Sequence, residues 1–197
     1  MREAKVATVT MPTGPAGTTT IGVAIAVPAP WGAQLQDYRT ALGDERAAGI
    51  PTHVTLVPPQ GIDPSQQRVV EQHLEEASTT NSAFRIHLRG TGTFRPVSPV
   101  VFVTVAEGIS SCEALARSVR RGPLDIEREF PYHPHVTVAH HVDDSAMDRA
   151  FEDLGSYHCT FAVTEFHLYE HGEDQVWRAV HAFSFDAGPA EGQAGRR

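Results

Sequence analysis

The chain contains only two cysteines, Cys112 and Cys159, among its 197 residues. Two cysteines are too few for a disulfide framework, and these two lack the close spacing of a metal site. Long apolar runs are also missing, because the run at residues 21–27 is short and is followed by Pro28 and Pro30. A bilayer-spanning helix needs about 20 apolar residues, so we expect neither a membrane segment nor a secretory signal. These absences favour a protein of the reducing cytoplasm.

Positive charge is scarce, with 16 Lys and Arg residues against 24 Asp and Glu and a net charge of −8. Proteins that bind long nucleic acids through their phosphates usually carry a basic face. We therefore expect a nucleotide or an RNA end as the binding partner, and neither a long duplex nor a membrane. Four arginines lie in strand-like segments, where a solvated strand face is their simpler explanation: Arg85, Arg89, Arg95 and Arg178. Arg178 is the best candidate for a phosphate contact because it adjoins Trp177.

One four-residue pattern, His-apolar-Thr-apolar, occurs twice in the chain. It begins at His53 and again at His135, 82 residues later, which is close to half the chain length. On a β-strand, alternate side chains point to opposite faces, so each His projects on the same side as the Thr two residues on. Two such strands placed side by side would offer two imidazoles and two hydroxyls, from Thr55 and Thr137, to one cleft. This constellation is typical of phosphodiester chemistry.

The residues before each motif also repeat. An apolar, β-branched run at 20–27 predicts a strand, and 31–42 predicts a helix with an apolar stripe. In the second half, 100–105 predicts a strand and 112–121 a helix with Ser110 or Ser111 as its N-cap. The distance from strand start to motif histidine is 32 residues in one half and 35 in the other. The chain is therefore predicted to contain two related lobes.

The remaining segments predict short strands and helices without long parallel crossovers. We expect a helix capped by Asp63 or Ser65 and ending near Ser78, followed by a strand at 83–93. A further helix is expected from Asp143 or Asp144 to Leu154. Two last strands, at 157–170 and 176–185, are expected to be joined through 171–174. This order predicts an α+β protein with one bilobal domain over residues 20–186. Residues 1–19 are predicted to form a flexible arm and residues 187–197 a disordered tail.

With these motifs the chain resembles the 2H phosphoesterase superfamily, which includes 2′-5′ RNA ligase-like proteins and cyclic phosphodiesterases. The resemblance covers roughly residues 20–186 and implies a bilobal α+β fold in which antiparallel sheets place the motif strands at a central cleft. It implies that His53, Thr55, His135 and Thr137 are catalytic. One position departs from the family pattern: many members carry an arginine shortly after the second motif, where this chain has His140, which is charged only when protonated.

The resemblance further implies opening of a 2′,3′-cyclic phosphate to a 2′-phosphate, and the reverse joining of RNA ends. Two imidazoles suit acid–base catalysis near neutrality, so the scheme needs no metal and no cofactor. We expect His135 to act as the base, His53 as the acid, and Arg178 and His140 to bind substrate. Tyr132 and Phe94 are candidates for stacking a base, although burial in a core would also explain them.

Two alternatives remain open at this stage. A protein of this fold that binds a nucleotide or RNA end without turnover would show the same two motifs. Four imidazoles lie within residues 133–141, so a metal-dependent hydrolase is a second, weaker alternative. A monomer is expected.

Overall fold

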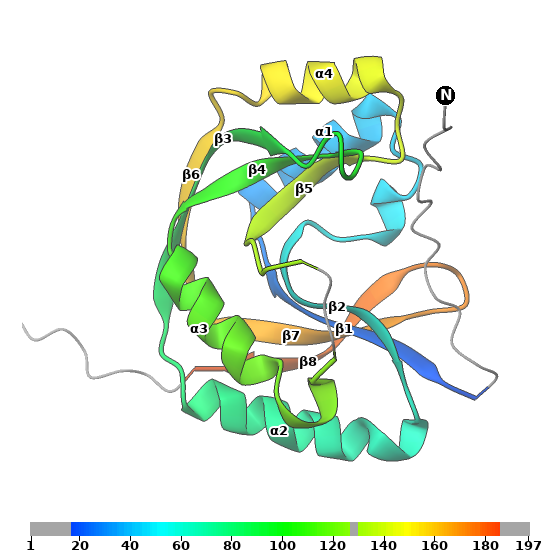
Figure 1. The fold of residues 1–197 in the computed structure, drawn as a ribbon, viewed down its shortest axis with the longest axis vertical. Coiled ribbons are helices and arrows are strands. Elements are labelled where there is room, and N and C mark those ends of the chain that lie inside the picture. Colours follow the sequence, from blue (N-terminus) through cyan, green and yellow to red (C-terminus); the bar gives the residue numbers. More distant parts are fainter. Residues whose placement is uncertain (1–16, 127–129, 186–197) are drawn as a thin grey trace, which may run out of the picture.

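The computed structural model describes residues 17–126 and 130–185. The predicted tail at 187–197 and the predicted arm up to residue 16 lie outside the described residues. Thr19, at the end of the predicted arm, already belongs to the first strand. The described chain forms two four-stranded antiparallel sheets with helices packed around them (Figure 1). No helix in the described ranges is long and apolar enough to cross a membrane.

The first sheet has the strand order β2-β1-β7-β8. Its strands are β1 (Thr19–Ala26), β2 (His53–Ile62), β7 (Glu165–His171) and β8 (Trp177–Ser184). The second sheet has the order β5-β4-β3-β6. Its strands are β3 (Phe84–Thr93), β4 (Val100–Glu107), β5 (His135–His140) and β6 (His158–Val163). The strand carrying a motif, β2 or β5, is thus an edge strand of each sheet.

Four α-helices connect these strands. They are α1 (Trp31–Leu42), α2 (Gln67–Thr79), α3 (Ile109–Val119) and α4 (Asp144–Asp153). Three single 3-10 turns, at Ala47–Gly49, Pro64–Gln66 and Gly122–Leu124, complete the described elements. The order strand, helix, motif strand therefore occurs twice, as β1-α1-β2 and β4-α3-β5, which confirms the predicted repeat.

Each sheet forms the centre of one lobe, and the helix that follows the strand of one sheet packs on the other sheet. Although α1 follows β1 of the first sheet, it packs against β5 of the second. In the same way α3 follows β4 of the second sheet and packs against β2 of the first. One hydrophobic core consequently includes residues of both sheets, among them Val54 and Leu56 on β2 and Val136 and Val138 on β5, all fully buried. This exchange holds the two motif strands against each other.

Two predicted elements differ from the structure. The segment 157–170 is not one strand but two, because β6 pairs with β3 in the second sheet and β7 pairs with β1 in the first. The sequence carries a signal of this break: buried positions alternate through Cys159 and Val163, then change phase to Phe166 and Leu168. A phase change moves the apolar side chains to the other face of a strand, so one continuous strand could not bury all of them in the same core.

The second difference concerns the start of α3, which was predicted at Cys112 with a serine N-cap. The helix begins at Ile109, and Gly108 is its N-cap with φ of 94°. A Cβ on Gly108 would lie 2.5 Å from the carbonyl oxygen of Arg85, so glycine is required by both conformation and space. Asp143 caps α4 as predicted and accepts from the Ala146 N–H. Asp63 instead caps the 3-10 turn Pro64–Gln66 that precedes α2, where it accepts from the Ser65 N–H.

Candidate functional site

The motif residues alternate as the sequence predicts. On β2, Val54 and Leu56 are fully buried in the core, while His53 and Thr55 are half-buried and face a cleft. On β5, Val136 and Val138 are fully buried, while His135 and Thr137 lie on the opposite face. Because β2 and β5 are edge strands that contact each other, the two motifs meet between the lobes.

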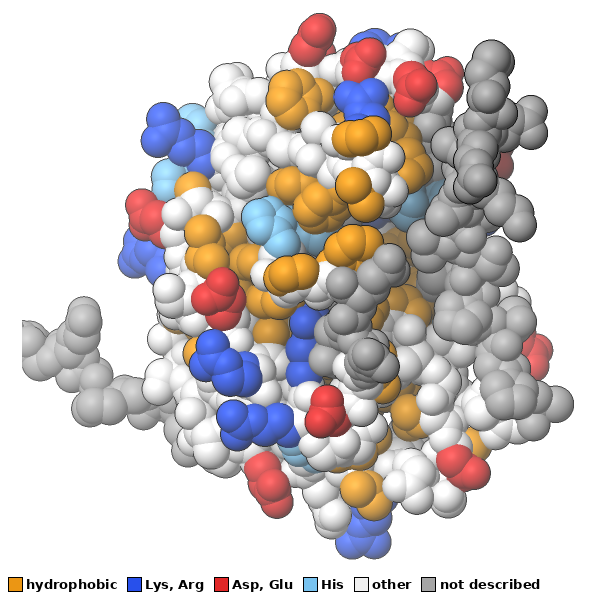
Figure 2. All heavy atoms as spheres, viewed as in Figure 1, with side chains coloured by type: hydrophobic (Ala, Val, Ile, Leu, Met, Phe, Trp, Pro, Cys, Tyr) orange, Lys and Arg blue, Asp and Glu red, His pale blue; other side chains and the backbone are white. Residues whose placement is uncertain are grey.

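The cleft encloses about 180 Å³. Its polar part is formed by three of the four motif side chains, without His135, together with one arginine and one further histidine: His53, Thr55, Thr137, Arg39 and His140. Its apolar part is formed by residues of β1, β8 and neighbouring segments, including Val23, Ile50, Pro59, Tyr169 and Trp177. Figure 2 shows hydrophobic and histidine side chains gathered across the middle of one face of the molecule. The cleft therefore combines groups for proton transfer with an apolar wall.

The two motif histidines are held in the same way. Nδ1 of His53 lies 2.6 Å from the carbonyl oxygen of Pro51, and Nδ1 of His135 lies 2.7 Å from that of His133. A carbonyl oxygen only accepts, so Nδ1 of each ring carries the proton and donates. Nε2 of each neutral ring is therefore left with a free lone pair. For His53 this lone pair accepts the Thr55 hydroxyl at 3.1 Å.

Burial keeps both imidazoles neutral. It lowers the pKa of His53, although the bond to the Pro51 carbonyl opposes this and the charge of Arg39 adds to it. It also lowers the pKa of His135 to about 4, with the bond to the His133 carbonyl again opposing and the nearby His133 and His53 contributing further. His53 is thus close enough to His135 to lower its pKa. At neutral pH the free protein carries two neutral imidazoles here.

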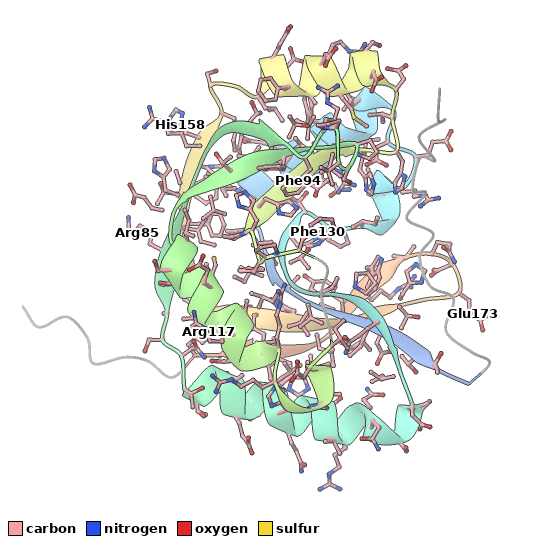
Figure 3. The ribbon with its side chains drawn as sticks, in the orientation of Figure 1. Arg85, Phe94, Arg117, Phe130, His158 and Glu173 are labelled. Atoms are coloured by element: carbon pink, nitrogen blue, oxygen red, sulfur yellow. The ribbon has the colours of Figure 1, made fainter. Side chains whose placement is uncertain are left out.

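Aromatic rings surround the second motif histidine. The Phe94 ring meets the His135 ring edge-on, with 5.0 Å between the centroids, and the Phe102 ring lies at the same distance. Phe94 points toward the space between the lobes, and so does Phe130, whose side chain is 60% exposed (Figure 3). Phe94, predicted to contact substrate, therefore lies beside a predicted catalytic residue.

The other predicted substrate-binding residues lie in different places. His140 lines the cleft, and its ring stacks on His141 with 3.6 Å between centroids; burial first, and then His141, lower its pKa to about 4. Tyr132 packs against the core beneath the guanidinium of Arg120, and its buried hydroxyl has no partner among the described residues. His140 is thus at the site, whereas Tyr132 is mainly a packing residue.

Arg178 is not among the residues that line the cleft. It lies in the β7–β8 hairpin, where its guanidinium pairs with the Asp174 carboxylate at 2.5 Å and is largely exposed. Trp177 faces the cleft, and side chains alternate along a strand, so Arg178 faces away from it. Arg85 points outward from the second sheet (Figure 3). Arg95 lies in the turn between β3 and β4, not in a strand as predicted, and pairs with Asp148.

Arg39 and the apolar wall are parts of the cleft that were not predicted from the sequence. Arg39 lies four residues after the buried Leu35 on α1, so it occupies the helix face that is turned to the core. That placement was a readable signal, since an arginine on an apolar stripe needs a buried partner. Tyr169 and Trp177 form a small hydrophobic cluster with Ala24, against which Ile50 packs. Their position beside the motifs follows only from the pairing of β7 with β1 and β8.

The described residues contain no group of three or more His, Cys, Asp or Glu side chains placed to hold a metal ion. His133 and His135 lie among the rings of Phe94 and Phe102, while His140 stacks on His141. The four imidazoles that are close in sequence therefore form two separate pairs.

The model of the 2′-5′ RNA ligase superfamily matches residues 27–175. The chain belongs to this superfamily. Curated relatives agree with the assignment. A protein of Bacillus cytotoxicus named "Putative phosphoesterase" is 25% identical over 147 residues, covering 74% of this chain and 85% of the relative. A Bacillus cereus protein of the same description is 24% identical over the same lengths. The resemblance to the 2H phosphoesterases is thereby confirmed.

Solved structures of the superfamily fold show the same architecture. Escherichia coli LigT in its apo form has a TM-score of 0.61 at 17% identity, covering 86% of this chain and 99% of LigT. A protein of Thermus thermophilus has a TM-score of 0.56 at 23% identity, covering 85% and 98%. At these identities the likeness concerns the fold. It confirms the predicted bilobal α+β fold of the 2H phosphoesterase type.

Proposed function

We propose that this superfamily member is a metal-independent phosphodiesterase that opens 2′,3′-cyclic phosphates of nucleotides or RNA ends to 2′-phosphates. The observation that carries the proposal is the matched pair of motif histidines, each with Nδ1 bonded to a carbonyl and Nε2 left as the reactive nitrogen. LigT has been solved in complex with 3′-AMP, which supports a nucleotide as the ligand proposed for this chain.

The proposed reaction needs two proton transfers. Nε2 of neutral His135 removes a proton from a water molecule whose oxygen attacks the phosphorus atom. The bond from phosphorus to the ribose 3′ oxygen breaks, and protonated His53 delivers the proton from its Nε2 to that oxygen. The Thr55 and Thr137 hydroxyls donate to non-bridging oxygens, where negative charge grows in the transition state. With the 5′ hydroxyl of a second RNA end in place of water, the same groups in the same roles support 2′-5′ joining of RNA ends: His135 removes the proton of that hydroxyl, and His53 protonates the leaving 3′ oxygen.

Differences between the two environments support this assignment of base and acid. Nε2 of His53 accepts the Thr55 hydroxyl. For His135 the hydrogen bond within the described residues is made by Nδ1, and Nε2 has no hydroxyl partner there. A free lone pair suits the base that activates water. His53 must gain a proton against its burial, so we propose that the bound phosphate anion supplies the negative charge that favours this proton.

The nucleoside is proposed to lie on the apolar wall. Ile50, Tyr169 and Trp177 border the cleft next to the motif residues. Aromatic side chains of this kind accept a base by stacking, with little preference for its identity. The cleft would thus recognise a cyclic phosphate with its attached nucleoside.

The test is hydrolysis of the four nucleoside 2′,3′-cyclic phosphates and of a short RNA with a cyclic end, in excess EDTA. His53→Ala and His135→Ala are each expected to lower kcat/KM about 10²- to 10⁴-fold. His158→Ala, at an exposed histidine far from the cleft (Figure 3), is the matched control and should keep full activity. The product should be the 2′-phosphate.

Three outcomes would contradict the proposal. Turnover that EDTA abolishes would indicate a metal-dependent hydrolase. A 3′-phosphate product would mean that the leaving oxygen is the 2′ oxygen. Tight nucleotide binding by the wild type without any turnover of these substrates would indicate a binding protein of the same fold.

A further inference from the structure

The cleft has one permanent positive charge among the described residues that line it, the guanidinium of Arg39. The other polar lining groups are hydroxyls and imidazoles, and burial lowers the pKa of both His53 and His140. A phosphodiester is an anion, and removing it from water into a partly apolar cleft is costly without a positive charge nearby. A cation is therefore needed at this place.

Arg39 is almost completely buried, with 4% of its surface exposed. Nη2 donates to Oδ2 of Asp44 at 2.7 Å, and Nη1 approaches the carbonyl oxygen of Ile50 at 3.4 Å, which is long for a hydrogen bond. Nε has no hydrogen-bond partner among the described residues. An orphaned donor on a buried charged group is rare and calls for an acceptor. The guanidinium of this cleft-lining residue is therefore only partly paired within the described protein.

The position of Arg39 relative to both motifs follows from the helix exchange. It lies in the last turn of α1, which packs against β5 of the opposite lobe. Its charge lowers the pKa of His53 on β2 and of His140 on β5, so it is near both motif strands. Asp44 fixes the guanidinium from one side, and its own Oδ1 accepts the Arg46 N–H at 3.1 Å.

We propose that Arg39 binds the phosphate, with an N–H of its guanidinium donating to a non-bridging oxygen of the cyclic diester and its charge balancing the anion. The planar guanidinium suits this role because one edge can remain on Asp44 while another meets the phosphate. This inference rests on the proposed function, since it assigns a residue to the phosphate of the same site. Arg39 does not move a proton; it binds the anion on which the histidines act.

A purely structural role is the competing explanation. Arg39 and Asp44 form a buried pair at the start of the connection that leads to His53, and breaking one partner of such a pair usually destabilises the fold. The experiment must therefore separate the loss of a phosphate contact from a displaced connection. Replacing both partners by apolar residues of similar size is often tolerated, which makes a double variant informative.

The experiment compares the wild type, Arg39→Lys and the double variant Arg39→Met with Asp44→Leu. The binding of adenosine 2′-monophosphate and of adenosine is measured by calorimetry, together with the melting temperature of each protein. Losing a hydrogen bond to a charged group corresponds to a roughly 10- to 100-fold loss in affinity. We expect such a loss for the monophosphate in the double variant, an about 10-fold loss in Arg39→Lys, and unchanged adenosine affinity in both.

An unchanged affinity for the monophosphate in a folded double variant would overturn the proposal, and so would an equal loss for adenosine and its monophosphate. If the double variant fails to fold, Arg39→Lys decides, because lysine keeps a charge for Asp44 and lacks the planar donor fork. Binding needs no turnover. A wild type that binds the monophosphate through Arg39 but opens no cyclic phosphate would contradict the proposed function, while the assignment of Arg39 to the phosphate would stand.

Discussion

Each motif histidine is oriented by the carbonyl oxygen two residues before it in the chain. For His53 that oxygen belongs to Pro51, and for His135 it belongs to His133. The bond is local, so the same ring orientation arises independently in both lobes. What differs between the two sites is set by their neighbours: Thr55 and Arg39 near His53, aromatic rings near His135. Two histidines with the same local orientation can therefore differ in role, one as acid and the other as base.

Residue alternation also separates two neighbours on β8. Trp177 lines the cleft, whereas Arg178 pairs with Asp174 on the hairpin. We predict that Trp177→Leu raises KM for a nucleoside cyclic phosphate about 10-fold, because base stacking on an aromatic ring is lost. Arg178→Ala is the matched control and should leave KM unchanged. Steady-state kinetics on both variants checks this, and an effect of Arg178→Ala as large as that of Trp177→Leu would contradict it.

At the scale of elements, the exchange of α1 and α3 between the lobes determines how the site is assembled. Each helix leaves one sheet and packs on the motif strand of the other. For α3 the chain must turn sharply after β4, and Gly108 makes that turn against the Arg85 carbonyl. The start of α3 is therefore a point where one side chain would disturb the packing of a helix on β2.

We predict that Gly108→Ala destabilises the protein by about 2–4 kcal/mol, since a left-handed conformation and a steric overlap both oppose the methyl group. Gly43→Ala provides the control, because Gly43 has φ of 98° but no atom within 4 Å of an added Cβ. Only the conformational cost applies there, about 1 kcal/mol. Urea unfolding measures both free energies. Equal losses in the two variants would mean that the contact with Arg85 is unimportant.

The molecule as a whole buries several histidines between its lobes. Burial lowers the pKa of His53, and lowers the pKa of His135 and of His140 to about 4, against an ordinary value near 6.5 in the unfolded chain. Between these values the unfolded chain binds more protons than the folded protein. Folding stability is therefore complete above about pH 6.5 and is lost progressively as the pH falls toward 4.

We predict that the melting temperature falls by roughly 5 °C or more between about pH 7 and pH 5. His140→Gln should make this fall smaller, because one buried group no longer gains a proton on unfolding. His158→Gln, at an exposed position, should leave the slope unchanged. Thermal scans monitored by circular dichroism at several pH values are sufficient. A His140→Gln variant with the wild-type slope would contradict the assignment of the acid sensitivity to the cleft.

Local pattern alone determined the most important features of the site. A strand alternates its side chains, so the repeated motif was enough to place His53 with Thr55, and His135 with Thr137, on one face over a buried apolar face. The spacing of strand, helix and motif was enough to predict two related lobes. These features depend on neighbours within a few residues, which is why they can be read without the fold.

Other features were decided only by the tertiary structure. Arg39 reaches the cleft because α1 packs on β5, and Trp177 does so because β8 joins β7 beside β1. Arg178, chosen from its neighbour in sequence, lies on the wrong face for the same reason that Trp177 lies on the right one. The chain also leaves one sheet for the other between Val163 and Glu165. Each of these depends on contacts between residues far apart in the chain, where burial and pairing of whole elements determine which side chains meet.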